Sequence, residues 1–310
     1  TNSTEVPDFA FFSDTLRDGL KGHVFDTTTT GYVSGASDLA DTIKGCFLGQ
    51  AGDWCTTPAQ SINYASCHDN MTLLDRISRS TPSASEEDRI RMNNLSAAIY
   101  MTAEGIPFMQ AGEEMLRTKK DASGGFVENS YNSPDSVNSL KWDTLEDETY
   151  QNVYNYYKGL IAFRKAHAAL RLTDAKDVAD NVTSVDGLDE NVLAFQINGG
   201  INNESSDGIF IIFNPNATET TVTLPDGSWD VCVNADKAGT EAITTISGEA
   251  SVEPISAMVL VKSDKEATPA TENTDTSFSV TKKISGVIAV CAAGIAAACG
   301  AVLYIFHKKR

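Results

Sequence analysis

The sequence predicts an α/β part, then an all-β part, then a C-terminal apolar helix. Three observations support this order. In the first half of the chain, short apolar segments alternate with amphipathic helical patterns, which is typical of a parallel sheet covered by helices. Short segments rich in β-branched and aromatic residues follow, separated by turn residues. Near the end, residues 284–306 form one uncharged apolar stretch.

The first part, residues 1–170, is predicted to contain a parallel sheet. Its strand-like segments are residues 9–12, 61–67 and 106–109. Ser85, with Asp88 three residues later, predicts the capped start of a helix, and Gly105 predicts where that helix ends. A second long helix is expected over residues 149–168, because their apolar side chains recur on one helical face.

The second part, residues 171–262, is predicted to be an antiparallel β-sandwich. Asn-Gly, Asp-Gly and Asn-Pro dipeptides favour tight turns between its strands. Consecutive short strands joined in this way are typical of two packed antiparallel sheets. The expected strands are residues 192–197, 209–213, 220–224, 229–233 and 257–261.

The C-terminal segment predicts membrane anchorage. Residues 263–283 are rich in Thr, Ser, Glu and Pro and predict a disordered stalk. Residues 284–306 are long enough for a helix that crosses the ~30 Å hydrocarbon core. Residues 307–310 form a basic tail expected in the cytoplasm, with the acidic domains outside the cell. A buried core helix is the alternative, and the sequence leaves open whether the helix is retained or processed.

Composition limits the ligands and cofactors. The 310-residue chain has a formal net charge of −18, which disfavours nucleic-acid binding but does not repel a neutral polymer. No C-x-x-C pair and no nucleotide-binding glycine motif occurs, so no metal and no cofactor are predicted, and a calcium requirement is left open. Cys46 and Cys55 would be the disulfide pair of an exported protein, which the sequence does not decide.

Polar residues follow two of the predicted strands. His68 and Asp69 come after one strand, and Glu113 and Glu114 after the next. Working residues of barrel enzymes lie at such carboxyl ends. Alternatively, Asp69 caps the next helix and His68 is a packed loop residue. Glu113 and Glu114 are expected either to line the cleft or to form ion pairs with Arg117.

Several segments resemble one enzyme family. Residues 61–74, which contain the run Cys-His-Asp-Asn, resemble a signature of the α-amylase superfamily. Residues 111–118 and 124–143 closely resemble type I pullulanases, which hydrolyse α-1,6 bonds in starch, and residues 12–22 resemble the region around their sixth barrel strand. The resemblance extends over residues 6–262. It implies that residues 1–170 form the C-terminal part of a (β/α)8 TIM barrel.

The resemblance also implies roles for individual residues. Asp69 matches the carboxylate that stabilises the oxocarbenium-like transition state, and His68 matches a ligand of sugar hydroxyls. Asn132, Asp135 and Asn138 are predicted to hydrogen-bond glucose units. Further expectations are that Tyr131 or Phe126 stacks on a sugar ring, and that Asp14, Arg17 and Asp18 are structural.

The nucleophile and the general acid of the family precede every matched segment. The chain also begins with a residue other than Met, so the front of the barrel is expected to lie outside this sequence. The chain alone is therefore predicted to be inactive. The expected function is part of an extracellular debranching hydrolase that acts on pullulan or branched α-glucans with retention. The alternatives are an α-1,4 or dual-specificity hydrolase and a non-catalytic glucan-binding fragment.

Overall fold

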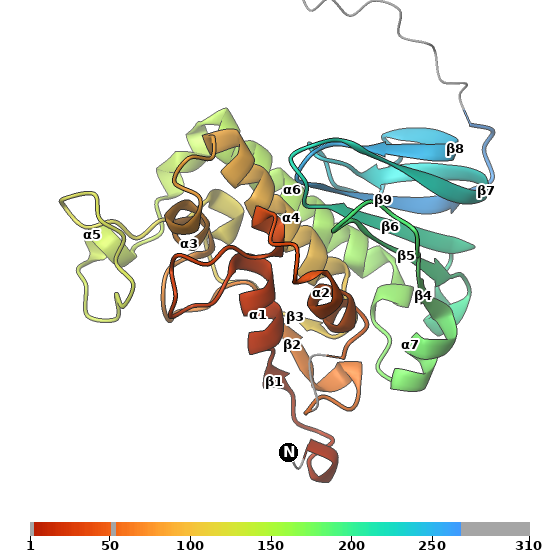
Figure 1. Ribbon diagram of the computed structural model, residues 1–310, viewed down its shortest axis with the longest axis horizontal. Coiled ribbons are helices and arrows are strands. Elements are labelled where there is room, and N and C mark those ends of the chain that lie inside the picture. The colour runs from red at the N-terminus through yellow and green to blue at the C-terminus, as the bar shows by residue number, and fades with distance from the viewer. Residues whose placement is uncertain (1–2, 51–53, 268–310) are drawn as a thin grey trace, which may run out of the picture. The chain divides into compact units, whose positions relative to one another are not determined.

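The computed structural model describes residues 3–50 and 54–267 (Figure 1). The predicted membrane helix at 284–306, the tail at 307–310 and most of the predicted stalk lie outside these residues. Within the part of the chain that the structure describes, no helix is long and apolar enough to cross a bilayer.

The first part contains the predicted parallel sheet. Strands β1 (Phe11–Phe12), β2 (Ser61–Asn63) and β3 (Ile106–Pro107) pair in the order β1-β2-β3, and both pairings are parallel. Four helices accompany them. These are α1 (Asp14–Lys21), α2 (Ala40–Phe47), α3 (Leu73–Ser80) and α4 (Glu86–Thr102). Strands joined through helices agree with the predicted α/β pattern, whereas the complete TIM barrel stays a prediction.

Capping residues fix the helix starts where the sequence predicted them. Ser85 accepts a hydrogen bond from the Asp88 N–H at 3.0 Å, and the Asp88 carboxylate accepts one from the Ser85 N–H at 3.4 Å. This reciprocal pair satisfies two N–H groups that the first turn of α4 leaves free. Helix α6 (Glu148–Ala166) begins after Asp147, whose side chain accepts from the Thr149 N–H at 2.8 Å.

A buried arginine of α6 holds the end of α4. The Arg164 guanidinium donates to the carbonyls of Met101 and Ala103, each at 2.9 Å, and of Gly105 at 2.7 Å. These carbonyls lie at the C-terminus of α4 and in the turn into β3, where helical partners are missing. Arg164 therefore fixes the entry of β3.

The all-β part is one six-stranded antiparallel sheet in the order β4-β5-β6-β9-β7-β8. A short helix, α7 (Ala175–Asn181), precedes it. The strands are β4 (Val182–Ser184), β5 (Leu193–Asn198), β6 (Gly208–Asn214), β7 (Thr220–Val233), β8 (Thr244–Val252) and β9 (Ser256–Ser263).

Hydrogen bonds connect all six described strands into one sheet, so the predicted sandwich of two packed sheets stays a prediction. The predicted strands 220–224 and 229–233 are two halves of β7, whose register with β8 shifts between Thr223 and Ser228. Buried side chains on one face pack against the helices, and Phe47 stacks on Phe195 at 3.8 Å between ring centroids. A second cluster around Trp229 draws residues from β5 to β9, so the bent sheet encloses a further core.

Figure 1 shows the six-stranded sheet beside α4 and α6, and α4 contacts both α6 and β9. The parallel sheet, in contrast, has large apolar side chains exposed to solvent. Phe11 and Phe12 of β1 are 41% and 48% exposed, and Ile106 of β3 is 43% exposed. Parallel strands are normally buried on both faces, so these apolar side chains are a feature that the described part of the chain does not cover.

Candidate functional site

The segment between β2 and α3 carries the predicted His–Asp pair. The His68 Nε2 lies 3.5 Å from an Asp69 carboxylate oxygen, and the two side chains are 89% and 70% exposed. Thr72, not Asp69, caps α3 by accepting from the Asp75 N–H at 3.2 Å. Asp69 is thus not a helix cap and His68 is not packed. Neither structural alternative applies to the pair.

A cluster of buried polar side chains fixes the start of this segment through hydrogen bonds to Glu113. The Ser66 hydroxyl donates to the Glu113 carboxylate at 2.5 Å, and the Tyr100 hydroxyl donates to its other oxygen at 2.9 Å. Glu113 is only 3% exposed, and burial raises its pKa to about 7. Lys21 at the end of α1 is also buried, and burial lowers the pKa of its ammonium group to about 8 although the Glu113 charge opposes the shift.

This cluster corrects the expectation for Glu113, which neither lines a cleft nor pairs with Arg117. It instead connects the segments that follow β2 and β3. Glu114 accepts from the Gly112 N–H at 2.8 Å, and Arg117 donates to the Ala111 and Asn138 carbonyls at 3.0 and 2.5 Å. Sequence reasoning missed Ser66, Tyr100 and Lys21, because only tertiary burial brings them together.

The residues after β1 form ion pairs, as predicted for structural side chains. Arg17 contacts Asp14 at 2.8 Å and Asp18 at 2.7 Å. The Tyr64 hydroxyl donates to Asp14 at 2.7 Å. Burial raises the pKa of Tyr64 above its usual value, and its hydrogen bond to the Asp14 carboxylate adds to the shift. Asp14 and Arg17, which both contact the Tyr64 hydroxyl, therefore connect α1 to the segment after β2.

The loop that carries the predicted sugar ligands is largely exposed. Figure 1 shows the loop around α5 (Asp135–Asn138) projecting from the helical part. Asn132 and Asp135 are exposed, whereas the Asn138 amide donates to the carbonyls of Ser130 at 2.6 Å and Ser133 at 3.1 Å. Within the described residues, no hydrogen bond or ion pair links Asn132, Asp135 or Asn138 to His68 or Asp69. Their predicted role is untested.

The predicted stacking residues differ in their surroundings. Tyr131 is 82% exposed, and the Lys120 ammonium lies 5.4 Å from the Phe126 ring centroid.

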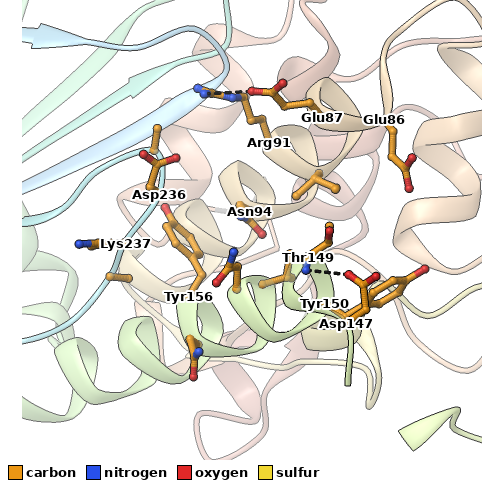
Figure 2. A pocket seen from close by; sticks show the side chains of 16 residues that line it. Glu86, Glu87, Arg91, Asn94, Asp147, Thr149, Tyr150, Tyr156, Asp236 and Lys237 are labelled. Atoms are coloured by element: carbon orange, nitrogen blue, oxygen red, sulfur yellow. Dashed lines mark hydrogen bonds and ion pairs between the residues drawn. The ribbon is translucent and has the colours of Figure 1, made fainter. Parts of the chain in front are cut away.

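A separate pocket of about 1040 Å³ lies where α4, α6 and the β7–β8 connection meet (Figure 2). It contains none of the predicted site residues. Figure 2 shows the side chains of Asn94, Tyr150, Tyr156 and Asp236 among those that line it. The Asn94 Oδ1 is buried and has no hydrogen-bond partner. Sequence reasoning missed this pocket, because its walls come from three distant segments.

Comparison with known proteins finds similarity to pullulanases. Residues 178–237 match the model of the pullulanase all-beta domain. The chain is 36% identical to a pullulanase of Bacillus subtilis (strain 168) over 202 residues, which is 63% of this chain and 27% of that protein.

Solved structures agree with the sequence comparison. A pullulanase from Bacillus acidopullulyticus matches with a TM-score of 0.77 and 38% identity over 82% of this chain and 30% of that chain. A type I pullulanase from Bacillus subtilis in complex with maltose matches with a TM-score of 0.77 and 30% identity over 84% of this chain and 36% of that chain.

The helical part with its antiparallel sheet is thus a pullulanase-like fold. The chain is a homologue of the pullulanases, and it spans roughly a third or less of the length of the relatives it matches.

Proposed function

We propose that this chain is part of a starch-debranching glycoside hydrolase that cleaves α-1,6 bonds in pullulan or branched α-glucans. The observation that carries the proposal is the exposed His68–Asp69 pair after β2, in a chain homologous to pullulanases. A related pullulanase structure is described as a complex with maltose, which supports an α-glucan as substrate.

The proposed chemistry assigns Asp69 to the transition state. Cleavage develops positive charge at the sugar ring, and a carboxylate that holds ring hydroxyls favours that charge. Within the described residues, Asp69 contacts no polar side chain other than His68 and is 70% exposed, so its oxygens are available to substrate. Retention requires a nucleophile and a general acid, with carboxyl groups ~5 Å apart. The family resemblance assigns both to a segment that precedes those matched here.

The exposed aromatic edge of the parallel sheet supports a longer catalytic domain. Phe11 and Phe12 occupy β1, one of the two edge strands, and their exposure is unusual for a parallel sheet. Burial of a phenylalanine side chain contributes ~1.5–3 kcal/mol. In this proposal, further strands of the complete enzyme cover β1 and extend the three strands into a TIM barrel.

Product analysis tests the linkage. The complete enzyme, incubated with pullulan, is expected to release maltotriose, because its α-1,6 bonds join maltotriose units. Release of panose or isopanose would instead indicate α-1,4 cleavage and would support the amylase-type alternative. Chromatographic separation of the trisaccharides distinguishes these outcomes.

The pocket between α4, α6 and the β7–β8 connection favours a second candidate function, non-catalytic glucan binding. Amide, carboxylate and tyrosine side chains offer donors, acceptors and an aromatic surface to an uncharged sugar (Figure 2). Titration of the chain with maltotetraose, followed by NMR, tests this function. An Asn94→Ala variant is expected to weaken the binding, and chemical shifts that do not change on titration would reject it.

We also propose that residues 284–306 anchor the protein in the cell membrane with the enzyme outside. Their uncharged sequence and the basic tail after them are the support. Protease added to whole cells is expected to release the domain and leave a small membrane stub. Full protection of the domain would contradict the orientation.

A further inference from the structure

Three consecutive residues after β2 present three different metal-binding groups. The Cys67 thiol, the His68 imidazole and the Asp69 carboxylate each offer one donor atom, and these atoms lie within 4.8 Å of one another. Cys67 is half-buried, while His68 and Asp69 are exposed. We propose that Cys67, His68 and Asp69 bind a Zn²⁺ ion in the segment that carries the candidate His68–Asp69 pair.

The geometry needs only a small adjustment. Zinc bonds of ~2.0–2.3 Å to sulfur, nitrogen and oxygen in a tetrahedron place the donor atoms about 3.3–3.6 Å apart. The His68 Nε2 and the Asp69 oxygen are already 3.5 Å apart. Rotation of the exposed His68 and Asp69 side chains can bring the three donor atoms within this range, because these two side chains have no other hydrogen-bond partner within the described residues.

The backbone on both sides of the three residues is fixed. Ser66 is fully buried and hydrogen-bonded to Glu113 at 2.5 Å. Asn70 has a left-handed φ of 60°, which suits an asparagine, and Thr72 caps α3. The donor groups therefore project from a turn that is held at both ends, which reduces the entropy lost on metal binding.

The donor set selects the ion. A thiolate and an imidazole favour Zn²⁺ over the hard cations Ca²⁺ and Mg²⁺, which prefer oxygen ligands. Two buried ammonium groups oppose a cation here, because Lys21 and Lys119 both interact with the Cys67 charge. The carboxylates of Glu113 and Asp75 offset these positive charges, because Glu113 interacts electrostatically with Lys21 and Asp75 with Lys119. Three protein ligands leave one tetrahedral position for water.

Bound zinc would inhibit the enzyme. The ion occupies the imidazole and the carboxylate that the proposed mechanism gives to the sugar, so substrate and metal compete. This consequence rests on the proposed function, whereas metal binding itself does not.

Cobalt substitution tests the site directly. The reduced 310-residue chain is titrated with Co²⁺ and then with Zn²⁺, and absorption is recorded. We expect a thiolate-to-cobalt charge-transfer band that Zn²⁺ displaces. Cys67→Ser should remove the band and weaken Zn²⁺ binding by on the order of 100-fold. His68→Gln should weaken binding and keep a weaker band, and circular dichroism checks that each variant is folded.

His23→Gln is the matched control. His23 is another exposed histidine beside a carboxylate, with its Nε2 3.9 Å from Asp18, but it has no thiol neighbour. This variant should bind like the wild type. Absence of a thiolate band in the wild type, or a band unchanged in Cys67→Ser, would overturn the site.

Activity measurements distinguish the proposed zinc site from the proposed catalytic function. The complete enzyme should lose pullulan hydrolysis in micromolar Zn²⁺ and regain it with EDTA, and Cys67→Ser should resist the inhibition. Zinc bound at Cys67 without inhibition would support the metal site and contradict the catalytic role of the His68–Asp69 pair.

Discussion

Replacement of Arg164 with methionine removes the side chain that joins α6 to the end of α4. Arg164 is 6% exposed and donates three hydrogen bonds of 2.7–2.9 Å to backbone carbonyls. Methionine preserves much of the aliphatic volume but donates nothing, so the Met101 and Ala103 carbonyls stay buried without this partner. The nearby Glu104 carboxylate also loses a favourable charge.

The magnitude follows from the number of carbonyls. Each buried acceptor left without a partner costs ~1–3 kcal/mol. The Gly105 contact is only partly buried, so water can replace it. Relief of the desolvated guanidinium offsets part of the loss, since burial lowers the pKa of Arg164 to about 10. We expect a net loss of ~3 kcal/mol, a large fraction of the ~5–15 kcal/mol stability of an ordinary domain.

Urea denaturation followed by circular dichroism measures this loss. Arg171→Met is the matched control, because Arg171 also donates to backbone carbonyls but is exposed. It should change the free energy of unfolding by less than ~1 kcal/mol. Equal effects of the two substitutions would refute the argument that burial makes Arg164 important.

Two further predictions concern the buried cluster and the packing of α6. Because folding raises the pKa of Glu113, its protonated form contributes to the free energy of unfolding, and this contribution is fully present below the unfolded pKa of 4.5. The contribution, at most ~3 kcal/mol, is lost as pH rises to about 7. Glu113→Gln should flatten this window in urea denaturation at several pH values, and an unchanged pH slope would reject the assignment. A Cβ on Gly159 of α6 would lie 1.9 Å from the Ala238 carbonyl oxygen, so Gly159→Ala should destabilise the protein by more than ~1–3 kcal/mol. Gly239→Ala, which meets nothing within 4 Å, should be neutral in the same thermal unfolding assay, and similar midpoints for the two variants would contradict the packing.

Local signals predicted the two long helices, α4 and α6. The capping residues Ser85 and Asp88 fixed the start of α4, and the apolar periodicity of α6 gave its buried face, because both signals act within a few residues. The position of His68 and Asp69 in the segment after β2 also followed from sequence, although β2 ends at Asn63 and the predicted strand extended to residue 67.

The β-sheet was harder, because its pairing depends on distant contacts. Pro225 to Gly227 has the composition of a turn, yet the chain continues through a bulge and β7 stays one strand. Strand β8 was missed, since Gly248 and its polar neighbours weaken the β pattern on this edge strand. Nothing local distinguishes a bent six-stranded sheet from two packed sheets.

The candidate site likewise contains residues that the sequence predicted and residues that only the fold brings together. The His68–Asp69 pair was visible in a contiguous signature, whereas the contacts of Glu113 with Ser66 and Tyr100 join residues from three elements. A buried glutamate is expensive unless hydrogen-bonded, and burial cannot be read from one position. Sequence reasoning therefore assigned Glu113 to a cleft or an ion pair.

Pullulan hydrolysis by the complete enzyme with Asp69→Asn tests the central claim most directly. The account predicts that kcat falls by about three orders of magnitude or more while the melting temperature is unchanged, since the Asp69 side chain is 70% exposed. Asp186→Asn, an exposed aspartate beside Lys44, should retain the wild-type rate. A near-wild-type kcat for Asp69→Asn would contradict the assignment of Asp69 to the transition state.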